Sequence, residues 1–400
     1  MHHFHHFHAF LRRWFDKCLN LIVAENGRAG VSWEHAWGDG VAVLNFFNAV
    51  HGAMEGAGEL SDSSLGVSPA PFSILSWNLD DRGRAACASA EAKAVSDASG
   101  LALRVFQTDS LNKDDIKRSG LSPDGVMQMA LQLAHWKVHV GGSPPTAAAA
   151  ALLPATYESA STAAYKHGRT ETIRRCVPPC LAHFVLALST KPSHVAHTHT
   201  HTHKQNSATP EALAMCQVFA NPSANPSLKF QTLSLATERH RALTIDGVQG
   251  AGCDRHLFAL RVLAEKPGTL GVGRGGGRPP TLPLFSHPSY AHFTDIRLST
   301  STMASSALDG GGFGPVNDHS YAVSYGVDER GCHFHIMART REGGGRANGL
   351  AAREVSTEFS GDLDVYAFAE ATEQALRDIV SCTAAVKGFT PRGGTGGFKK

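Results

Sequence analysis

Runs of apolar and alternating residues predict two β-hairpins, one near each end of the chain. Residues Cys18 to Ala24 read as a strand, Asn26-Gly27 is a dipeptide typical of a two-residue hairpin turn, and Gly30 to Glu34 reads as the return strand. Two further strand-like runs, near Tyr321 to Val327 and Cys332 to Ala338, flank a polar turn. Strands therefore contribute to both halves of the chain.

Helical spacing of apolar residues predicts two prominent helices. Ser122-Pro123-Asp124 is typical of a helix start, with Ser122 as N-cap and Pro123 at the first helical position. The apolar face of this helix consists of Val126, Met127, Ala130, Leu131, Leu133 and Ala134. A closing amphipathic helix is predicted over roughly Val365 to Val380, and the whole pattern indicates an α/β protein.

Size and charge limit the classes of protein that this chain can represent. Its 400 residues, 42% of them hydrophobic, predict two domains or one large one, and we place the boundary near Ser68-Pro69-Ala70-Pro71. A net charge of +2 and the lack of a Lys/Arg stripe predict no nucleic-acid partner. The apolar run from Leu181 to Leu188 contains His183 and is too short for a transmembrane helix.

Low-complexity segments interrupt the patterned regions near 141–153, 178–207 and 266–284, and we interpret them as insertions that form loops. The histidine tracts could bind transition metals weakly, but no Cys or carboxylate lies at ligand spacing. We therefore predict solvated segments and no metal site. The eight cysteines show no metal-ligand pairs and are interpreted as reduced thiols of an intracellular protein.

His35 is the first candidate for catalysis, because it follows the return strand of the first hairpin. An imidazole can take a proton from an alcohol if a second group fixes its tautomer, and Asp39 is the nearest carboxylate. The alternatives are a structural histidine and an aspartate that caps the turn Trp37-Gly38-Asp39-Gly40.

An ordered series of sequence blocks resembles the choline/carnitine acyltransferase family. The blocks are RWFDK from Arg13, WEHAWGDGVAVLNFFN from Trp33, LSPD from Leu121, TYESASTAAYKHGRTETIR from Thr156, CDRHLFALR from Cys253, LSTST from Leu298 and GGFGPV from Gly311. The Trp-Gly-Asp-Gly stretch favours the long-chain, mitochondrial branch of the family.

The resemblance implies a chloramphenicol acetyltransferase-like, CoA-dependent acyltransferase fold with two α/β domains and an active site between them. Family members carry a long portion before RWFDK, so the chain looks truncated at its N-terminus. We then expect a His-rich segment outside the family over residues 1–11, a remnant of the N-terminal catalytic domain with the catalytic histidine over 12–70, and a C-terminal acyltransferase domain with the insertions over 71–400.

By the same resemblance the chain is a carnitine O-acyltransferase that moves a long-chain acyl group reversibly between CoA and L-carnitine. His35 would be the general base, Asp39 would orient it, and Ser301 would face the oxyanion. No cofactor is implied beyond the substrates. The expected location is the mitochondrion, with possible peripheral association with the inner membrane. The competing expectation is a non-catalytic remnant that at most binds CoA or an intact partner chain.

The resemblance also assigns binding residues. Carnitine would be held by Tyr157, Ser159, Thr170, Arg255 and Phe313, CoA by Lys113, Lys117 and Asp124, and the acyl channel would pass Gly311. Simpler alternatives remain open: Arg255 could form a surface salt bridge, the lysines could belong to a solvated charged loop weakened by Asp114 and Asp115, and Gly311 could serve only the backbone.

Overall fold

The computed structural model describes residues 17–56, 76–141, 153–167, 170–174, 209–265, 282–305, 307–340 and 363–388. The chain divides into two compact units: residues 1–101 with 305–309, and residues 102–304 with 310–400. The predicted boundary near Ser68 to Pro71 and most of the three predicted insertions lie outside the described residues.

The first unit contains the predicted hairpin. Strands β1 (Leu19–Val23) and β2 (Ala29–Trp33) pair antiparallel with Leu19 opposite Trp33. Gly27 adopts φ 79°, which a glycine accepts without strain, and the side chain of Asn26 accepts a hydrogen bond from the Arg28 amide. The dipeptide that predicted the turn therefore forms it.

Two helices follow in this unit, each with an aspartate at its start. Asp39 accepts hydrogen bonds from the backbone at the beginning of α2 (Gly40–Gly56), and Asp80 accepts one from Gly83 at the beginning of α3 (Asp81–Ser99). These carboxylates satisfy amide groups that a helix start leaves unpaired.

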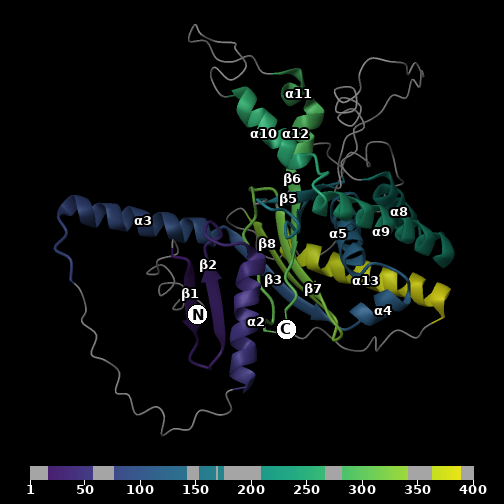
Figure 1. Ribbon diagram of the computed structural model, residues 1–400, viewed down its shortest axis with the longest axis horizontal. Helices are drawn as coiled ribbons and strands as arrows, with labels where there is room; N and C mark the ends of the chain where they lie inside the picture. The colour runs from purple at the N-terminus through teal and green to yellow at the C-terminus, as the bar shows by residue number, and fades with distance from the viewer. Residues whose placement is uncertain are drawn as a thin grey trace. The chain divides into compact units, whose positions relative to one another are not determined.

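A mixed six-stranded sheet forms the centre of the second unit, with the order β3-β8-β7-β6-β4-β5 (Figure 1). Its strands are β3 (Leu101–Thr108), β4 (Ala155–Ala160), β5 (Glu171–Arg174), β6 (Ile296–Thr302), β7 (Tyr321–Val327) and β8 (Cys332–Arg339). Strands β4, β6 and β7 run parallel, whereas the pairs β4–β5 and β7–β8 are antiparallel. The predicted strands near Tyr321 and Cys332 are confirmed.

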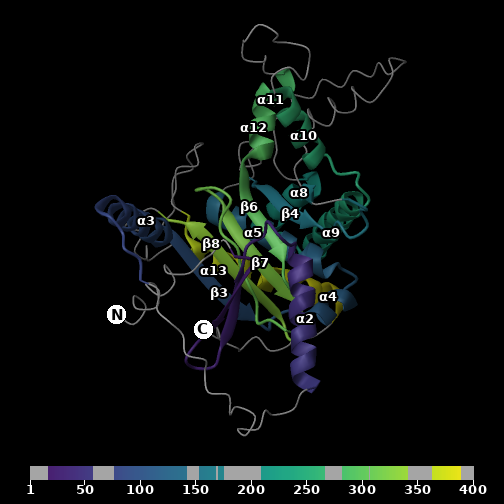
Figure 2. The same ribbon diagram turned by 60° about the vertical axis from the view of Figure 1, so that its left-hand side comes forward.

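A layer of helices covers one face of this sheet (Figures 1 and 2). They are α4 (Lys113–Arg118), α5 (Pro123–His139), α8 (Pro210–Ala220), α9 (Pro226–Val248) and α13 (Val365–Lys387), while α10 (Asp254–Glu265), α11 (Pro283–Ser286) and α12 (Pro288–Thr294) lie beyond the end of β6. Within the layer, α5, α9 and α13 contact the strands, and α4 and α8 pack on those helices. Most of α5 is buried, and the Tyr321 and Phe368 rings stack at 4.2 Å between sheet and α13. None of the described helices combines the length and apolar character needed to cross a membrane.

Both predicted helices are present. Ser122 caps α5 by accepting a hydrogen bond from the Gly125 amide at 3.2 Å. The closing helix α13 continues past Val380 to Lys387 and ends at Gly388 in the left-handed conformation. At the edges of the predicted insertions, Leu153 is buried in the core and Pro283 begins α11.

Buried His135 of α5 makes the stability of this unit depend on pH. Burial, the neighbouring His139 and then Arg297 hold its pKa well below the ordinary 6.5. The contribution of His135 to the free energy of unfolding is therefore fully present above pH 6.5 and is lost as the pH falls below it. In that range the histidine is protonated in the unfolded chain but stays neutral in the native state. One histidine contributes at most about 1.4 kcal/mol per pH unit.

We expect His135→Leu to reduce the loss of unfolding free energy between about pH 7.5 and pH 5.5, measured by urea denaturation of both proteins. Histidines remote from His135 have the same surroundings in both proteins, so their contributions cancel in the comparison. Identical losses in the two proteins would contradict this assignment.

Candidate functional site

His35 lies in the turn directly after β2, as the sequence predicted. The indole of Trp37 donates a hydrogen bond to the carbonyl of Cys18 at 2.8 Å, which holds the turn against the base of the hairpin. His35 Nε2 lies 3.5 Å from Asp39 Oδ1, and the same carboxylate oxygen accepts a hydrogen bond from the Gly40 amide at 2.8 Å. Asp39 thus serves both alternatives: it caps α2 and lies beside the imidazole.

All other predicted site residues belong to the second unit, and three of them share one face of the sheet. Tyr157 of β4 pairs in register with Ser299 of β6, so Tyr157, Ser159 and Ser301 point to the same side. This side is opposite to the helices, because the alternate residue Thr300 accepts a hydrogen bond from Gln128 of α5. The structure therefore brings the predicted oxyanion residue beside two predicted carnitine residues.

A row of polar side chains that sequence reasoning missed continues from Ser301 across this face. Ser301 lies opposite Ser324 of β7, and Ser324 lies opposite His335 of β8. Ser324 is 1% exposed, and its hydroxyl has no hydrogen-bond partner among the described residues. Burial and then the nearby His333 lower the pKa of His335, which favours the neutral imidazole. Only the strand register reveals the row.

Thr170 and Arg255 lie near β5, the edge strand of the sheet. Thr170 directly precedes β5, whose first residue, Glu171, pairs with Ala160 at the end of β4. Gly252, just before α10, packs so closely on the Glu171 carboxylate that an added Cβ would lie 2.7 Å from its carbon. The start of α10, which carries Arg255, therefore lies beside β5.

Arg255 makes a local ion pair in this structure. Its Nε donates to Asp254 Oδ2 at 2.6 Å, and its guanidinium carbon lies 5.4 Å from the centre of the Phe258 ring. The Asp254 side chain is 3% exposed, whereas that of Arg255 is 32% exposed. The salt-bridge alternative thus describes this arrangement.

The predicted CoA lysines lie on α4, away from the β4–β6 junction in sequence and in the sheet order. Lys113 Nζ is 3.7 Å from Glu329, and Lys117 is exposed. Of the two acidic residues between them, Asp115 is buried and paired with Arg118, whereas Asp114 is exposed. Arg118 thus offsets the charge of Asp115, whereas Glu329 and Asp114 still offset the lysine charges.

Gly311 lies against a methionine. A Cβ at this position would be 2.9 Å from the terminal methyl group of Met303, which is 9% exposed. The same loop crosses His335, since an added Cβ at Gly310 would collide with His335 Nε2. Phe313 follows in this loop and is partly buried. The space beside Gly311 is thus occupied by Met303.

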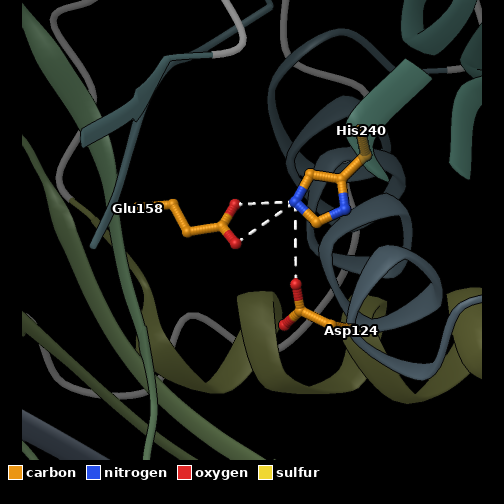
Figure 3. Close-up of side chains that lie close together, drawn as sticks. All are labelled: Asp124, Glu158 and His240. Carbon is orange, nitrogen blue, oxygen red and sulfur yellow. Dashed lines mark hydrogen bonds and ion pairs between the residues drawn. The ribbon is translucent and has the colours of Figure 1, made fainter. Parts of the chain in front are cut away.

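Asp124 belongs to a cluster with Glu158 and His240, and Figure 3 shows the two carboxylates directed at one imidazole nitrogen. His240 Nε2 lies 3.1 Å and 3.2 Å from the Glu158 oxygens and 3.7 Å from Asp124 Oδ2. Asp124 also accepts a hydrogen bond from the Tyr325 hydroxyl at 2.5 Å. Burial, and then the charges of Glu158 and Asp124, raise the pKa of Tyr325.

Residue spacing does not reveal this cluster, because Glu158 and His240 are 82 residues apart and lie on different elements. It is the one group of three or more potential metal ligands within the described residues, and the sequence prediction of no metal site did not consider it.

Comparisons with known proteins agree with the blocks in the sequence. A model of the family described as Choline/Carnitine o-acyltransferase matches residues 2–205 and 194–351. Carnitine O-palmitoyltransferase 2, mitochondrial, from Xenopus tropicalis is 34% identical over 330 residues, which cover 81% of this chain and 42% of the relative. The protein of the same name from Homo sapiens is 33% identical over 328 residues, covering 80% and 42%.

A more distant relative is similar over the same part of the chain. Carnitine O-palmitoyltransferase 1, muscle isoform, from Homo sapiens is 29% identical over 346 residues, covering 82% of this chain and 37% of the relative. The chain thus spans about two-fifths of the length of the curated relatives it matches.

Proposed function

Because this chain belongs to the choline/carnitine O-acyltransferase family, we propose that it transfers a long-chain acyl group reversibly between CoA and L-carnitine. The names of its relatives support palmitoyl groups as substrates and the mitochondrion as the location. The mixed sheet with helices on one face is compatible with the chloramphenicol acetyltransferase-like fold, which is part of the proposal. Peripheral association with the inner membrane is proposed on the family likeness alone.

The proposed reaction needs a base, an oxyanion donor and two binding sites. His35 takes the proton of the carnitine hydroxyl as its oxygen attacks the thioester carbonyl. The Ser301 hydroxyl donates a hydrogen bond to the oxygen that gains negative charge. When the carbon–sulfur bond breaks, the CoA thiolate receives the proton back from the His35 imidazolium. No acyl-enzyme forms, and Asp39 steadies the imidazolium between the two steps.

One observation carries the carnitine part of this proposal: residues from two separate sequence blocks lie side by side on one face of β4 and β6, and two further candidates lie near the edge strand β5. Tyr157 and Ser159 lie on β4, and Ser301 lies on the neighbouring β6. Thr170 directly precedes β5, and Arg255 lies on α10, which contacts β5. A buried carboxylate requires a cation and hydrogen-bond donors, and these side chains supply both.

The remaining assignments follow from the family likeness. Lys113 and Lys117 are proposed for the CoA phosphates, and Phe313 is proposed for the trimethylammonium group. Asp124 is proposed near CoA, although it contacts Tyr325. An acyl channel past Gly311 requires the Met303 side chain to move aside.

The test is release of the CoA thiol from palmitoyl-CoA by the purified 400-residue chain, with and without L-carnitine. We expect carnitine-dependent release, and we expect Arg255→Ala to raise the KM for carnitine about 10- to 100-fold while leaving the KM for palmitoyl-CoA nearly unchanged. Arg261→Ala is the matched control, because Arg261 lies on the same helix over the same Phe258 ring and pairs with Glu265.

Two results would contradict the proposal. Binding of CoA without carnitine-dependent release would favour the non-catalytic alternative. Equal increases of both Michaelis constants in Arg255→Ala would show that Arg255 supports the fold and does not bind carnitine.

A further inference from the structure

The imidazole of His240 links three elements of the second unit. His240 lies on α9, Glu158 lies on β4, and Asp124 lies in the first turn of α5. His240 and Glu158 are 3% and 4% exposed, so their contact is shielded from water. Figure 3 shows both Glu158 oxygens facing Nε2, with the shorter distance at 3.1 Å.

The surroundings of His240 determine its tautomer. Its Nδ1 is buried without a hydrogen-bond partner among the described residues. This nitrogen lies close to Gly125 of α5, since a Cβ added at Gly125 would be 3.4 Å from it. A proton on Nδ1 would be a buried donor with no acceptor, which is costly. The proton is therefore assigned to Nε2, which donates to the Glu158 carboxylate.

This tautomer argues against a metal ion in the cluster. A metal would take the lone pair of Nε2 and force the proton onto Nδ1, where metal-bound histidines normally donate to a carboxylate or carbonyl. The described residues offer no such acceptor to Nδ1 of His240. The contact with Glu158 is thus a hydrogen bond between an imidazole and a carboxylate.

Glu158 stands between the two β4 residues proposed to contact carnitine. Side chains alternate along a strand, so Glu158 points to the helices while Tyr157 and Ser159 point to the opposite face. On the neighbouring strand, Thr300 pairs with Glu158 and donates to the Tyr157 carbonyl at 2.9 Å. Fixing the Glu158 side chain therefore fixes the stretch of backbone that carries both flanking residues.

We propose that His240 is a positioning residue for the carnitine site: by donating to Glu158, it holds β4 so that Tyr157 and Ser159 keep the orientation that carnitine requires. This inference rests on the proposed function. It gives His240 no contact with substrate and no part in proton transfer.

The experiment compares His240→Leu and His240→Gln with the unaltered chain. A glutamine side chain can place its amide N–H near the position of Nε2, whereas leucine fills the space without a donor. His135→Leu is the matched control, because His135 is also a histidine buried in the helical layer, at 1% exposure. Two quantities are measured: hydrogen exchange of the β4 amides by mass spectrometry, and the Kd values for L-carnitine and CoA by calorimetry.

We expect His240→Leu to speed exchange in β4 but not in β7, and to raise the Kd for carnitine about tenfold or more with the Kd for CoA unchanged. His240→Gln should restore much of both, and His135→Leu should leave both as in the unaltered chain. Unchanged β4 exchange in His240→Leu, or equal losses for carnitine and CoA, would overturn the inference. If the unaltered chain fails to bind carnitine, the proposed function is wrong, and β4 exchange still decides whether His240 holds the strand.

Discussion

Replacing His35 with alanine should lower the rate of acyl transfer by about two to four orders of magnitude, the usual contribution of a general base. The Kd for palmitoyl-CoA should change little, because the imidazole acts on the carnitine hydroxyl. The reason lies in the turn after β2, where Asp39 is 3.5 Å from His35 Nε2 and can stabilise the imidazolium. Initial rates at saturating palmitoyl-CoA and carnitine provide the measurement.

His51→Ala is a matched control within the same unit. His51 Nδ1 lies 3.8 Å from Glu55 and shares the four-residue spacing of His35 and Asp39, but it lies inside α2. We expect its removal to leave the rate unchanged. A His35→Ala protein that retains full turnover would remove His35 from the mechanism.

Gly331→Ala should lower the free energy of unfolding of the second unit by about 3 kcal/mol or more. Gly331 lies in the turn between β7 and β8 with φ 154°, where an L-residue is strained. An added Cβ would collide with the carbonyl oxygen of Thr108 and lie 3.1 Å from the Cα of Asp109. Backbone atoms at the end of β3 cannot swing aside as a flexible side chain can.

Gly120→Ala gives the cost of a positive φ at a site where the added Cβ meets no other atom. Gly120 also has a positive φ, 80°, but no atom lies within 4 Å of its added Cβ. The strain alone should cost about 1 to 2 kcal/mol. Unfolding of both variants in urea gives the two values, and a Gly331→Ala loss no larger than that of Gly120→Ala would show that the β3 backbone yields.

Local chemistry made part of the fold predictable from the sequence. Asn26-Gly27 sets its own turn geometry, and Ser122-Pro123 starts α5 through a cap that involves only neighbouring residues. The order of the six strands was not predictable, because it depends on pairings between distant segments. No local pattern distinguishes an edge strand such as β5 from a central strand such as β6.

The candidate site shows the same division. The sequence blocks supplied Tyr157, Ser159 and Ser301, and the strand register supports placing them together. Their partners could not be read from the blocks. His240 lies outside every quoted block, and the Met303 side chain reaches Gly311 only because the loop after β6 folds back on itself. Such contacts depend on how distant segments pack together, and residue spacing along the sequence does not predict that packing.

The strand order also bears on how the chain folds during its synthesis. Contacts of the finished unit join residues far apart: the Tyr325 hydroxyl and Asp124 are separated by 201 positions, and the Cys332 thiol and the Leu111 carbonyl by 221. Folds dominated by such distant contacts form slowly. Helix α5 leaves the ribosome long before β7 and β8 exist to bury it, so its apolar face stays open to other chains during that interval. The yield of folded protein in a cell should therefore depend on chaperones more than on the stability of the finished sheet.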